Sequence, residues 1–162
     1  MIIVVMGVTG SGKTSEGMLL AQRLGWEFAD ADDFHSAANK DKMHRGIPLT
    51  DADRLPWLQA MHDYLAKAAA ENRSVILACS ALKRSYRETL LGGLDARVAY
   101  LKGTYDLIAR RLRERKGHFA DEHILAAQFA DLEEPTDAVV VDITPLPEAI
   151  VDEIMRRLNL SS

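Results

Sequence analysis

The sequence predicts an α/β protein in which a parallel sheet is covered by helices on both faces. Five short apolar segments recur along the 162 residues, and a segment with helical character separates each from the next. A glycine-rich sequence of the phosphate-binding kind lies between the first apolar segment and the first helix. The sequence contains no internal repeat and no Pro/Gly/Ser-rich linker, so we expect one domain over residues 1–162.

Strands are expected where short apolar runs can be buried on both faces, as the strands of parallel sheets are. The first run is continuous from Met1 to Met6 and stops at Gly7. The predicted strands cover residues 1–6, 26–29, 74–79, 96–101 and 138–141.

Helices are expected between and after these strands. They cover residues 13–24, 83–91, 105–115, 121–132 and 147–158. A further helix carries Pro56 in its first turn, where proline is tolerated. Its apolar face is formed by Trp57, Met61 and Leu65 at i, i+4 and i+8. The stretch before this helix, residues 34–53, is polar and is assigned no regular structure.

Residues 7–14, Gly-Val-Thr-Gly-Ser-Gly-Lys-Thr, match the full phosphate-loop pattern G-x-x-x-x-G-K-[ST]. Glycines let backbone N–H groups point inward at phosphate oxygens, and the positive end of the following helix adds to that field. We expect the lysine to reach the β- and γ-phosphates of ATP or GTP, and the threonine hydroxyl to ligate Mg²⁺. The residues assigned to the nucleotide are Gly7, Thr9, Gly10, Ser11, Gly12, Lys13 and Thr14.

Length and motif content narrow the class of nucleotide-binding protein. The chain is too short for most ATPase motors, and the guanine-reading sequence Asn-Lys-x-Asp of GTPases does not occur in it. A small kinase is therefore the leading interpretation. A nucleotide sensor that binds ATP without turnover is the alternative from another class.

The composition argues against several other classes. Cys79 is the only cysteine, which excludes an internal disulfide framework and a multi-cysteine zinc site. A net charge of −4 is a poor footprint for a dedicated nucleic-acid binder. The opening apolar run is too short to span a membrane and lacks the flanks of a signal peptide. We expect a cytoplasmic protein without nucleic-acid or membrane partners.

Acidic residues follow the second predicted strand. If the two-residue period of the strand persists, Asp30 and Asp32 lie on one face and Asp33 on the other. Ligands of open α/β sheets bind at this end of the strands. One carboxylate can hold a water on Mg²⁺ while another accepts a proton from an attacking hydroxyl group.

Basic residues follow two later strands. Residues 110–116 carry five positive charges and one negative, and arginines there could neutralise a transferring phosphoryl group, with Gly117 as a hinge. Lys83, Arg84 and Arg87 suit an anionic substrate, although a helix-surface role is equally open for Arg84. His35, in the polar stretch, could hydrogen-bond a polyol.

With the phosphate loop, the acids after the second strand and the basic residues after the third and fourth strands, the chain resembles the bacterial-type gluconate kinases of the P-loop kinase group. The resemblance runs from residue 5 to about residue 142. Its most specific parts are Asp-Arg-x-Pro-Trp-Leu at residues 53–58 and Ser-Ala-Leu-Lys-x-x-Tyr-Arg at residues 80–87. The sequence departs from the family pattern at Ala31 (glycine expected), at Ser36 (proline expected) and at Asp33, an additional carboxylate.

The resemblance implies a three-layer P-loop kinase fold with a five-stranded sheet in the order 2-3-1-4-5. It places the substrate-binding stretch at about residues 33–72 and a small lid at about residues 112–131. The implied activity is ATP-dependent phosphorylation of D-gluconate at the 6-hydroxyl, giving 6-phospho-D-gluconate for the pentose phosphate or Entner–Doudoroff routes. The implied assembly is a homodimer. A shikimate-kinase-like enzyme is the alternative among kinases.

The resemblance also implies roles for single residues. Asp32 is expected to accept the proton of the 6-hydroxyl, and Asp30 to hold a water on Mg²⁺ beside Thr14. Arg111 is expected to serve the nucleotide. The expected catalytic residues are Lys13, Asp32 and Arg115. The residues expected to contact gluconate are Asp32, His35, Arg54, Lys83 and Arg87.

Overall fold

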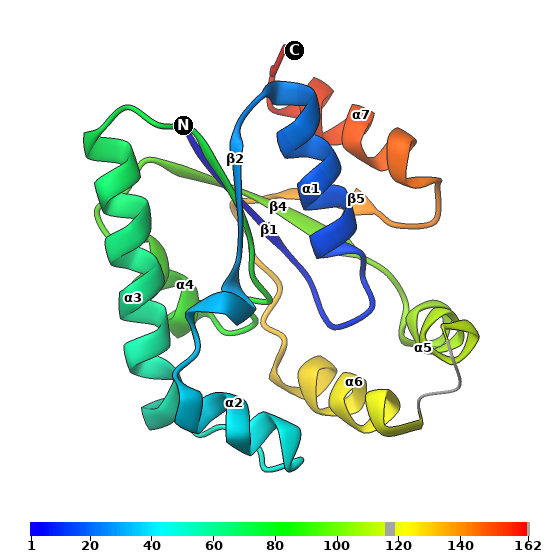
Figure 1. The fold of residues 1–162 in the computed structure, drawn as a ribbon. Coiled ribbons are helices and arrows are strands. Elements are labelled where there is room, and N and C mark those ends of the chain that lie inside the picture. Colours follow the sequence, from blue (N-terminus) through cyan, green and yellow to red (C-terminus); the bar gives the residue numbers. More distant parts are fainter. Residues whose placement is uncertain (116–118, 162) are drawn as a thin grey trace.

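Residues 1–115 and 119–161 are described in the computed structural model of the chain, and they form three layers around a parallel sheet (Figure 1). The strands are β1 (Ile2–Met6), β2 (Glu27–Asp30), β3 (Val75–Ala78), β4 (Ala96–Lys102) and β5 (Val139–Asp142). The helices are α1 (Lys13–Leu24), α2 (Ala37–His44), α3 (Asp51–Ala70), α4 (Arg84–Leu91), α5 (Tyr105–Glu114), α6 (Phe119–Asp131) and α7 (Pro147–Arg157). A short 3-10 helix, η1 (Ala31–Phe34), follows β2.

The sheet has the order β2-β3-β1-β4-β5, and every pair of neighbouring strands is parallel. The predicted fold class and strand order are therefore confirmed. In Figure 1, α1 and α7 lie on one side of the sheet and α3 and α4 on the other.

Alternate residues of β1 point to opposite faces of the sheet, as the two-residue period of a strand requires. Ile3 and Val5 join the hydrophobic cluster that includes residues of α1 and α7. Ile2, Val4 and Met6 join the cluster that includes residues of α3 and α4. Because β1 is buried on both faces, its sequence is an unbroken apolar run.

The polar stretch after β2 contains a helix, α2, that the hydrophobic pattern does not predict. Ser36 caps this helix, because its Oγ accepts a hydrogen bond from the Asn39 N–H at 3.1 Å. Gly46, with a φ of 71°, ends it. There the Ile47 N–H donates a hydrogen bond to the Lys42 carbonyl at 2.8 Å. The departure from the family pattern at Ser36 thus has a local role as a helix cap.

The long helix α3 begins earlier than predicted. Thr50 and Asp53 form a capping box in which each side chain accepts a hydrogen bond from the other's backbone N–H. The helix therefore starts at Asp51, and Pro56 lies inside it rather than in its first turn. Proline removes one backbone donor there, but Ala52, four residues earlier, is exposed, so water can satisfy its carbonyl group.

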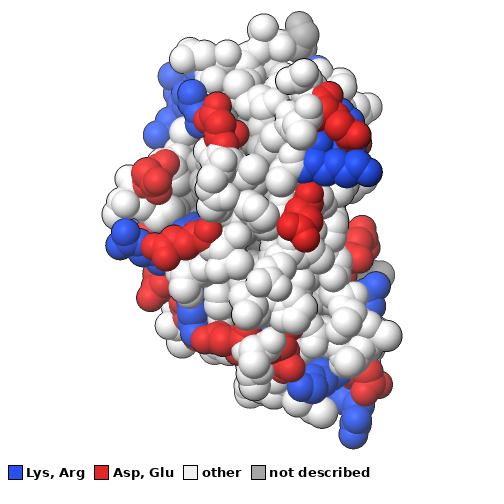
Figure 2. Space-filling view, turned by 90° about the vertical axis from the view of Figure 1, so that its left-hand side faces the viewer, with Lys and Arg blue, Asp and Glu red and all other residues white. Residues whose placement is uncertain are grey.

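Figure 2 shows the side of the molecule that lies to the left in Figure 1, where α3 runs. Positive and negative side chains are interspersed over this face, and an uncharged band runs between them. Among the helices in the described part of the chain, none is long and apolar enough to cross a membrane.

The cap of α3 gives a test of this part of the fold. Thr50→Ala should lower the free energy of unfolding by about 1 kcal/mol, because the Asp53 N–H loses its partner. Urea denaturation measures the change. Thr89→Ala is the matched control, because its hydroxyl returns to the Ser85 carbonyl inside α4 and caps nothing. Equal losses in the two variants would contradict the capping role.

Candidate active site

The loop between β1 and α1 adopts a conformation that depends on its glycines. Gly10 and Gly12 have φ angles of 78° and 98°, which residues with a Cβ rarely adopt. An added Cβ on Gly10 would lie 2.8 Å from Leu112 of α5, and one on Gly12 would collide with the Glu16 carboxyl group. The backbone can therefore curl tightly into the N-terminus of α1, where amide groups and the helix dipole favour a phosphate group.

Lys13 is the first residue of α1, and its side chain is partly buried. Burial lowers the pKa of its ammonium group, and the charges of Asp32 and Asp30 oppose that shift. A cation that has lost part of its hydration gains strongly from a nearby anion. The position of Lys13 at the end of the loop therefore suits contact with a phosphate group.

The chain turns into η1 directly after Asp30 instead of continuing as a strand. The expectation that strand alternation places Asp30 and Asp32 on one face therefore does not hold. Instead, the Asp30 carboxylate accepts hydrogen bonds from Thr14 Oγ1 and from the Asp32 N–H, each at 3.0 Å. The turn leaves Asp32 and Asp33 exposed. The Asp30 carboxylate therefore contacts the phosphate loop through Thr14, and the negative charge of Asp32 raises the pKa of Lys13.

Thr14 and Asp30 together offer oxygen ligands of the kind that Mg²⁺ takes. Within the described residues, no group of three or more His, Cys, Asp and Glu side chains could hold a metal ion. One hydroxyl and one carboxylate fit a Mg²⁺ ion that shares its remaining ligands with phosphate oxygens and water.

His35 is fixed beside the acids by stacking on Trp57. The two ring centroids lie 4.3 Å apart with an interplanar angle of 11°. Trp57 in turn donates its Nε1–H to the Ala31 carbonyl at 2.7 Å, which ties α3 to η1. Burial lowers the pKa of His35, an effect that Asp32 opposes and that Arg54 and Lys40 reinforce. The neutral ring is therefore favoured near pH 7, and it can both donate and accept hydrogen bonds.

Two of the predicted substrate cations meet around one phenol ring. Arg54 Nη1 donates to the Tyr86 hydroxyl at 3.1 Å, and the Lys83 ammonium lies 5.5 Å from the centroid of the same ring. The Tyr86 hydroxyl donates to Asp51 Oδ1 at 2.6 Å. The structure therefore brings together Arg54 of α3 and Lys83 of the β3–α4 connection, as the resemblance implies.

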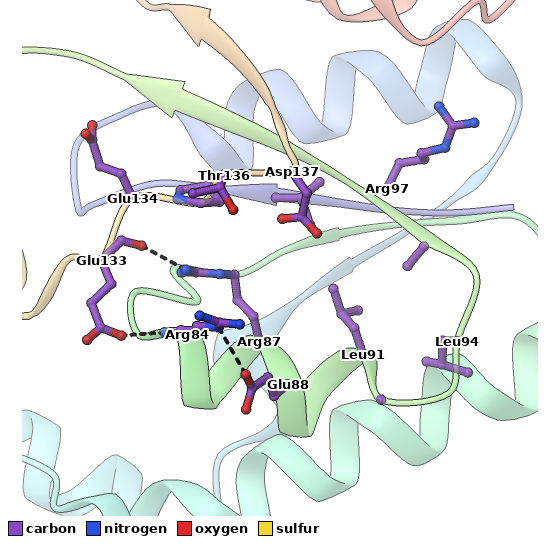
Figure 3. A pocket seen from close by; sticks show the side chains of 14 residues that line it. Arg84, Arg87, Glu88, Leu91, Leu94, Arg97, Glu133, Glu134, Thr136 and Asp137 are labelled. Atoms are coloured by element: carbon purple, nitrogen blue, oxygen red, sulfur yellow. Dashed lines mark hydrogen bonds and ion pairs between the residues drawn. The ribbon is translucent and has the colours of Figure 1, made fainter.

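Arg87 has a different environment from the other two predicted substrate cations. Its guanidinium donates to the carbonyls of Ala81, Leu82 and Glu133 at 2.7, 3.1 and 2.8 Å. It lines an open groove of about 750 Å³ between α4 and residues 133–137 (Figure 3). No hydrogen bond or ion pair joins Arg87 to Arg54, Lys83 or Tyr86 among the residues that the structure describes. Arg87 thus holds the connection after β3 against the segment that leads into β5.

The basic segment at the end of α5 is partly committed to contacts within the protein. Arg111 Nη2 donates to the Thr144 carbonyl at 3.4 Å, and Arg113 pairs with Glu122 of α6. Arg115 follows the last residue of α5 and is exposed. The predicted hinge at Gly117 and the rest of residues 116–118 lie outside the described residues.

The phosphate loop makes a further contact, with α6, that no sequence motif predicts. Gln128 of α6 accepts a hydrogen bond from the Thr9 N–H at 2.6 Å. This bond fixes α6 against the loop and occupies one of the loop amides. An isolated glutamine in a helix carries no signal of such a role, so sequence reasoning misses it.

Comparisons with known proteins agree with this geometry. The AAA domain family matches residues 2–135. A probable gluconokinase of Mus musculus is 47% identical over 153 residues, which cover 83% of each chain. A gluconokinase of Gluconobacter oxydans is 43% identical over 161 residues, covering 97% of this chain and 90% of that one. The crystal structure of a gluconokinase from Sinorhizobium meliloti 1021 has a TM-score of 0.84 at 41% identity, covering 97% of this chain and 90% of that chain.

Glu16, in the first turn of α1 behind the phosphate loop, has an unusual environment. Its side chain is buried, and its Oε2 atom has no hydrogen-bond partner among the described residues. Burial raises the pKa of this carboxyl group above its ordinary value of 4.5, although the charge of Arg111 opposes the shift. The folded state then binds more protons than the unfolded state above pH 4.5, so ionisation of Glu16 destabilises the fold as the pH rises.

A neutral side chain at position 16 should remove this pH dependence. The melting temperature of Glu16→Gln, relative to wild type, should therefore increase as the pH rises above about 4.5, and level off once the pH exceeds the raised pKa of Glu16 in the folded protein. Thermal unfolding over a series of pH values measures the difference. Glu114→Gln, which removes an exposed carboxyl group from the end of α5, is the control. A difference that stays constant or shrinks with rising pH would contradict the burial of an ionisable Glu16.

Proposed function

This chain belongs to the gluconokinase family, and we propose that one edge of its sheet moves the γ-phosphate of ATP to the 6-hydroxyl of D-gluconate. It is an ATP-dependent kinase that phosphorylates gluconate. One observation supports the assignment of roles to residues. The phosphate loop, the Asp30–Asp32 turn and Lys83 follow the carboxyl ends of β1, β2 and β3, which are neighbours in the sheet. Donor, base and acceptor groups therefore lie along one edge.

The nucleotide end of the site is assigned to the phosphate loop. Backbone amides of the loop and the N-terminus of α1 hold the phosphates. Lys13 stabilises the negative charge that develops on the γ-phosphate during transfer. Thr14 and Asp30 would hold Mg²⁺, Thr14 directly and Asp30 through a water. When bound, this ion neutralises charge on the β- and γ-phosphate oxygens. Arg111 would approach the nucleotide from α5, next to the Thr144 carbonyl.

The acceptor end of the site is assigned to the acids after β2. Phosphoryl transfer has a loose transition state, which asks mainly for alignment and for late removal of the proton. Asp32 would accept a hydrogen bond from the 6-hydroxyl, orient it toward the γ-phosphate and take its proton. Asp32 is exposed on the η1 turn, within the field of Lys13. His35, stacked on Trp57, would hydrogen-bond a hydroxyl group of the sugar acid.

The substrate's carboxylate lies at the opposite end of gluconate from the 6-hydroxyl. Arg54 and Lys83 supply two cations close to Tyr86, and we assign the carboxylate to them. Arg87 supports this site indirectly, because its bonds to Ala81 and Leu82 shape the connection that carries Lys83.

We further propose that the chain works as one domain with a closing segment. Residues 112–131 would act as the lid, with Arg115 reaching the transferring phosphate when the segment closes. Leu112 of α5 packs against Gly10 of the phosphate loop, so a movement of α5 would change the packing around this loop. A homodimeric assembly and a cytoplasmic location are part of the same proposal, on the basis of the family resemblance.

The substrate assignment is tested by ADP release in a coupled assay with gluconate, glucose and shikimate. Gluconate should support turnover. Glucose lacks the carboxylate, so its kcat/KM should be about 10- to 100-fold lower, the value of hydrogen bonds to a charged group. Equal use of glucose would contradict the role of Arg54 and Lys83. Turnover with shikimate but not gluconate would favour a shikimate-kinase-like enzyme, and ATP binding without turnover would favour a sensor.

The role of Asp32 is tested by Asp32→Asn, which keeps the shape of the side chain but cannot take a proton. Its kcat with gluconate should fall by about 10²–10⁴-fold, with the KM for gluconate changed only a few-fold. Asp33→Asn is the matched control, because Asp33 is the next residue and is also exposed on η1. The assignment is wrong if Asp32→Asn keeps more than half of its turnover, or if Asp33→Asn loses as much.

A further inference from the structure

Three side chains converge on a single carboxylate oxygen at the N-terminal end of α3. Asp51 Oδ1 accepts a hydrogen bond from the Tyr86 hydroxyl at 2.6 Å. The same atom lies 3.7 Å from Lys83 Nζ and 3.8 Å from Arg54 Nη1. One hydroxyl and two cations around one oxygen make a binding site for a carboxylate group, and a carboxylate of the chain itself lies in it.

The donors of this site are held in place without Asp51. Tyr86 is buried, and Arg54 Nη1 donates to its hydroxyl at 3.1 Å. The Arg54 guanidinium and the Lys83 ammonium each lie 5.5 Å from the centroid of the Tyr86 ring. Burial and the bond to Asp51 raise the pKa of Tyr86, so the phenol stays protonated and remains a donor.

Asp51 is held less firmly than the groups around it. Its side chain is 68% exposed, against 26% for Arg54 and 31% for Lys83. The capping box of α3 is made by Thr50 and Asp53, so the side chain of Asp51 is not needed to start the helix. The Tyr86 hydroxyl and the two cations lower the pKa of Asp51, which is therefore an anion. A short, exposed carboxylate of this kind can rotate into water without loss of the helix.

We propose that Asp51 occupies the carboxylate site in the free enzyme and that the carboxylate of gluconate displaces it on binding. This inference rests on the proposed function and names the group with which the substrate competes. One carboxylate replaces another, so Tyr86, Arg54 and Lys83 have an anionic partner both in the free enzyme and in the gluconate complex. The site is then ready for substrate only in the fraction of molecules whose Asp51 has swung out, and the apparent affinity is reduced by that fraction.

The same exchange affects specificity. A sugar without a carboxylate does not leave the cations unpaired, because Asp51 can remain in place while it binds. Asp51 therefore weakens the binding of gluconate but leaves the binding of glucose nearly unchanged. Removal of its charge should increase the preference of the enzyme for gluconate over glucose.

The test compares wild type with Asp51→Asn, which keeps the size of the side chain and removes its charge. Gluconate binding is measured by calorimetric titration without ATP, and KM and kcat by the coupled assay. Asp51→Asn should lower both the Kd and the KM for gluconate by about two- to five-fold, the value of a partly exposed ion pair. The kcat and the KM for ATP should not change. Asp63→Asn, an exposed acid further along α3, is the control and should leave every value as in wild type.

A second pair of variants isolates the Tyr86 hydroxyl. Asp51→Asn/Tyr86→Phe should bind gluconate about ten-fold more weakly than Asp51→Asn, because the substrate loses a hydrogen bond to its charged group. Asp51→Ser keeps a good residue for the first turn of a helix, and it should repeat the tighter binding if Asp51→Asn is unstable.

The outcomes separate this inference from the function on which it rests. An Asp51→Asn variant with an unchanged or higher Kd for gluconate overturns the displacement, provided that wild type phosphorylates gluconate. An equal gain in Asp63→Asn also overturns it, because the effect would then be one of general charge. A wild-type enzyme without gluconate-dependent ADP release overturns the proposed function instead.

Discussion

The parallel pairing of β1 with β3, and of β3 with β2, is the constraint on which the site depends. Parallel strands end at the same edge of a sheet, so the segments that follow them are brought together however distant they are in sequence. The apolar residues of β1 stabilise this arrangement, because alternate residues pack against the helical layers on opposite faces of the sheet. The phosphate loop, the acids after β2 and Lys83 therefore lie at one edge of the sheet although they are far apart in the sequence.

The cations near this edge differ in the partners that they already have. Arg87 donates to three backbone carbonyls, which are neutral acceptors that a substrate would not replace without loss. Arg54 and Lys83 instead share the exposed carboxylate of Asp51, a partner that an anionic substrate can replace in kind. Lys83, at the N-cap of α4, therefore has a partner that can be exchanged, whereas Arg87, in the first turn of the same helix, is held by backbone carbonyl groups.

Local physical rules predict the five strands and the phosphate loop from the sequence, because buried strands and glycine-rich turns each have a distinct pattern, whereas the strand order follows from the family resemblance. The helix α2 escapes such rules, since its few apolar residues do not line up on one face and the helix is defined by a Ser36 cap and a Gly46 turn. The family resemblance implies the same role, contact with gluconate, for Arg54, Lys83 and Arg87. Only the folded chain distinguishes them, because the carbonyl of Glu133 that binds Arg87 lies 46 residues away in sequence.

The central claim, transfer of phosphate to the primary hydroxyl of gluconate at this edge, is tested most directly by ³¹P NMR of the product. Wild type with ATP, Mg²⁺ and gluconate should give a phosphomonoester signal split by two methylene protons, in amounts equal to the ADP formed. The signal should be absent with Lys13→Ala. Release of ADP with inorganic phosphate alone would contradict the account, as would a phosphomonoester coupled to a single proton.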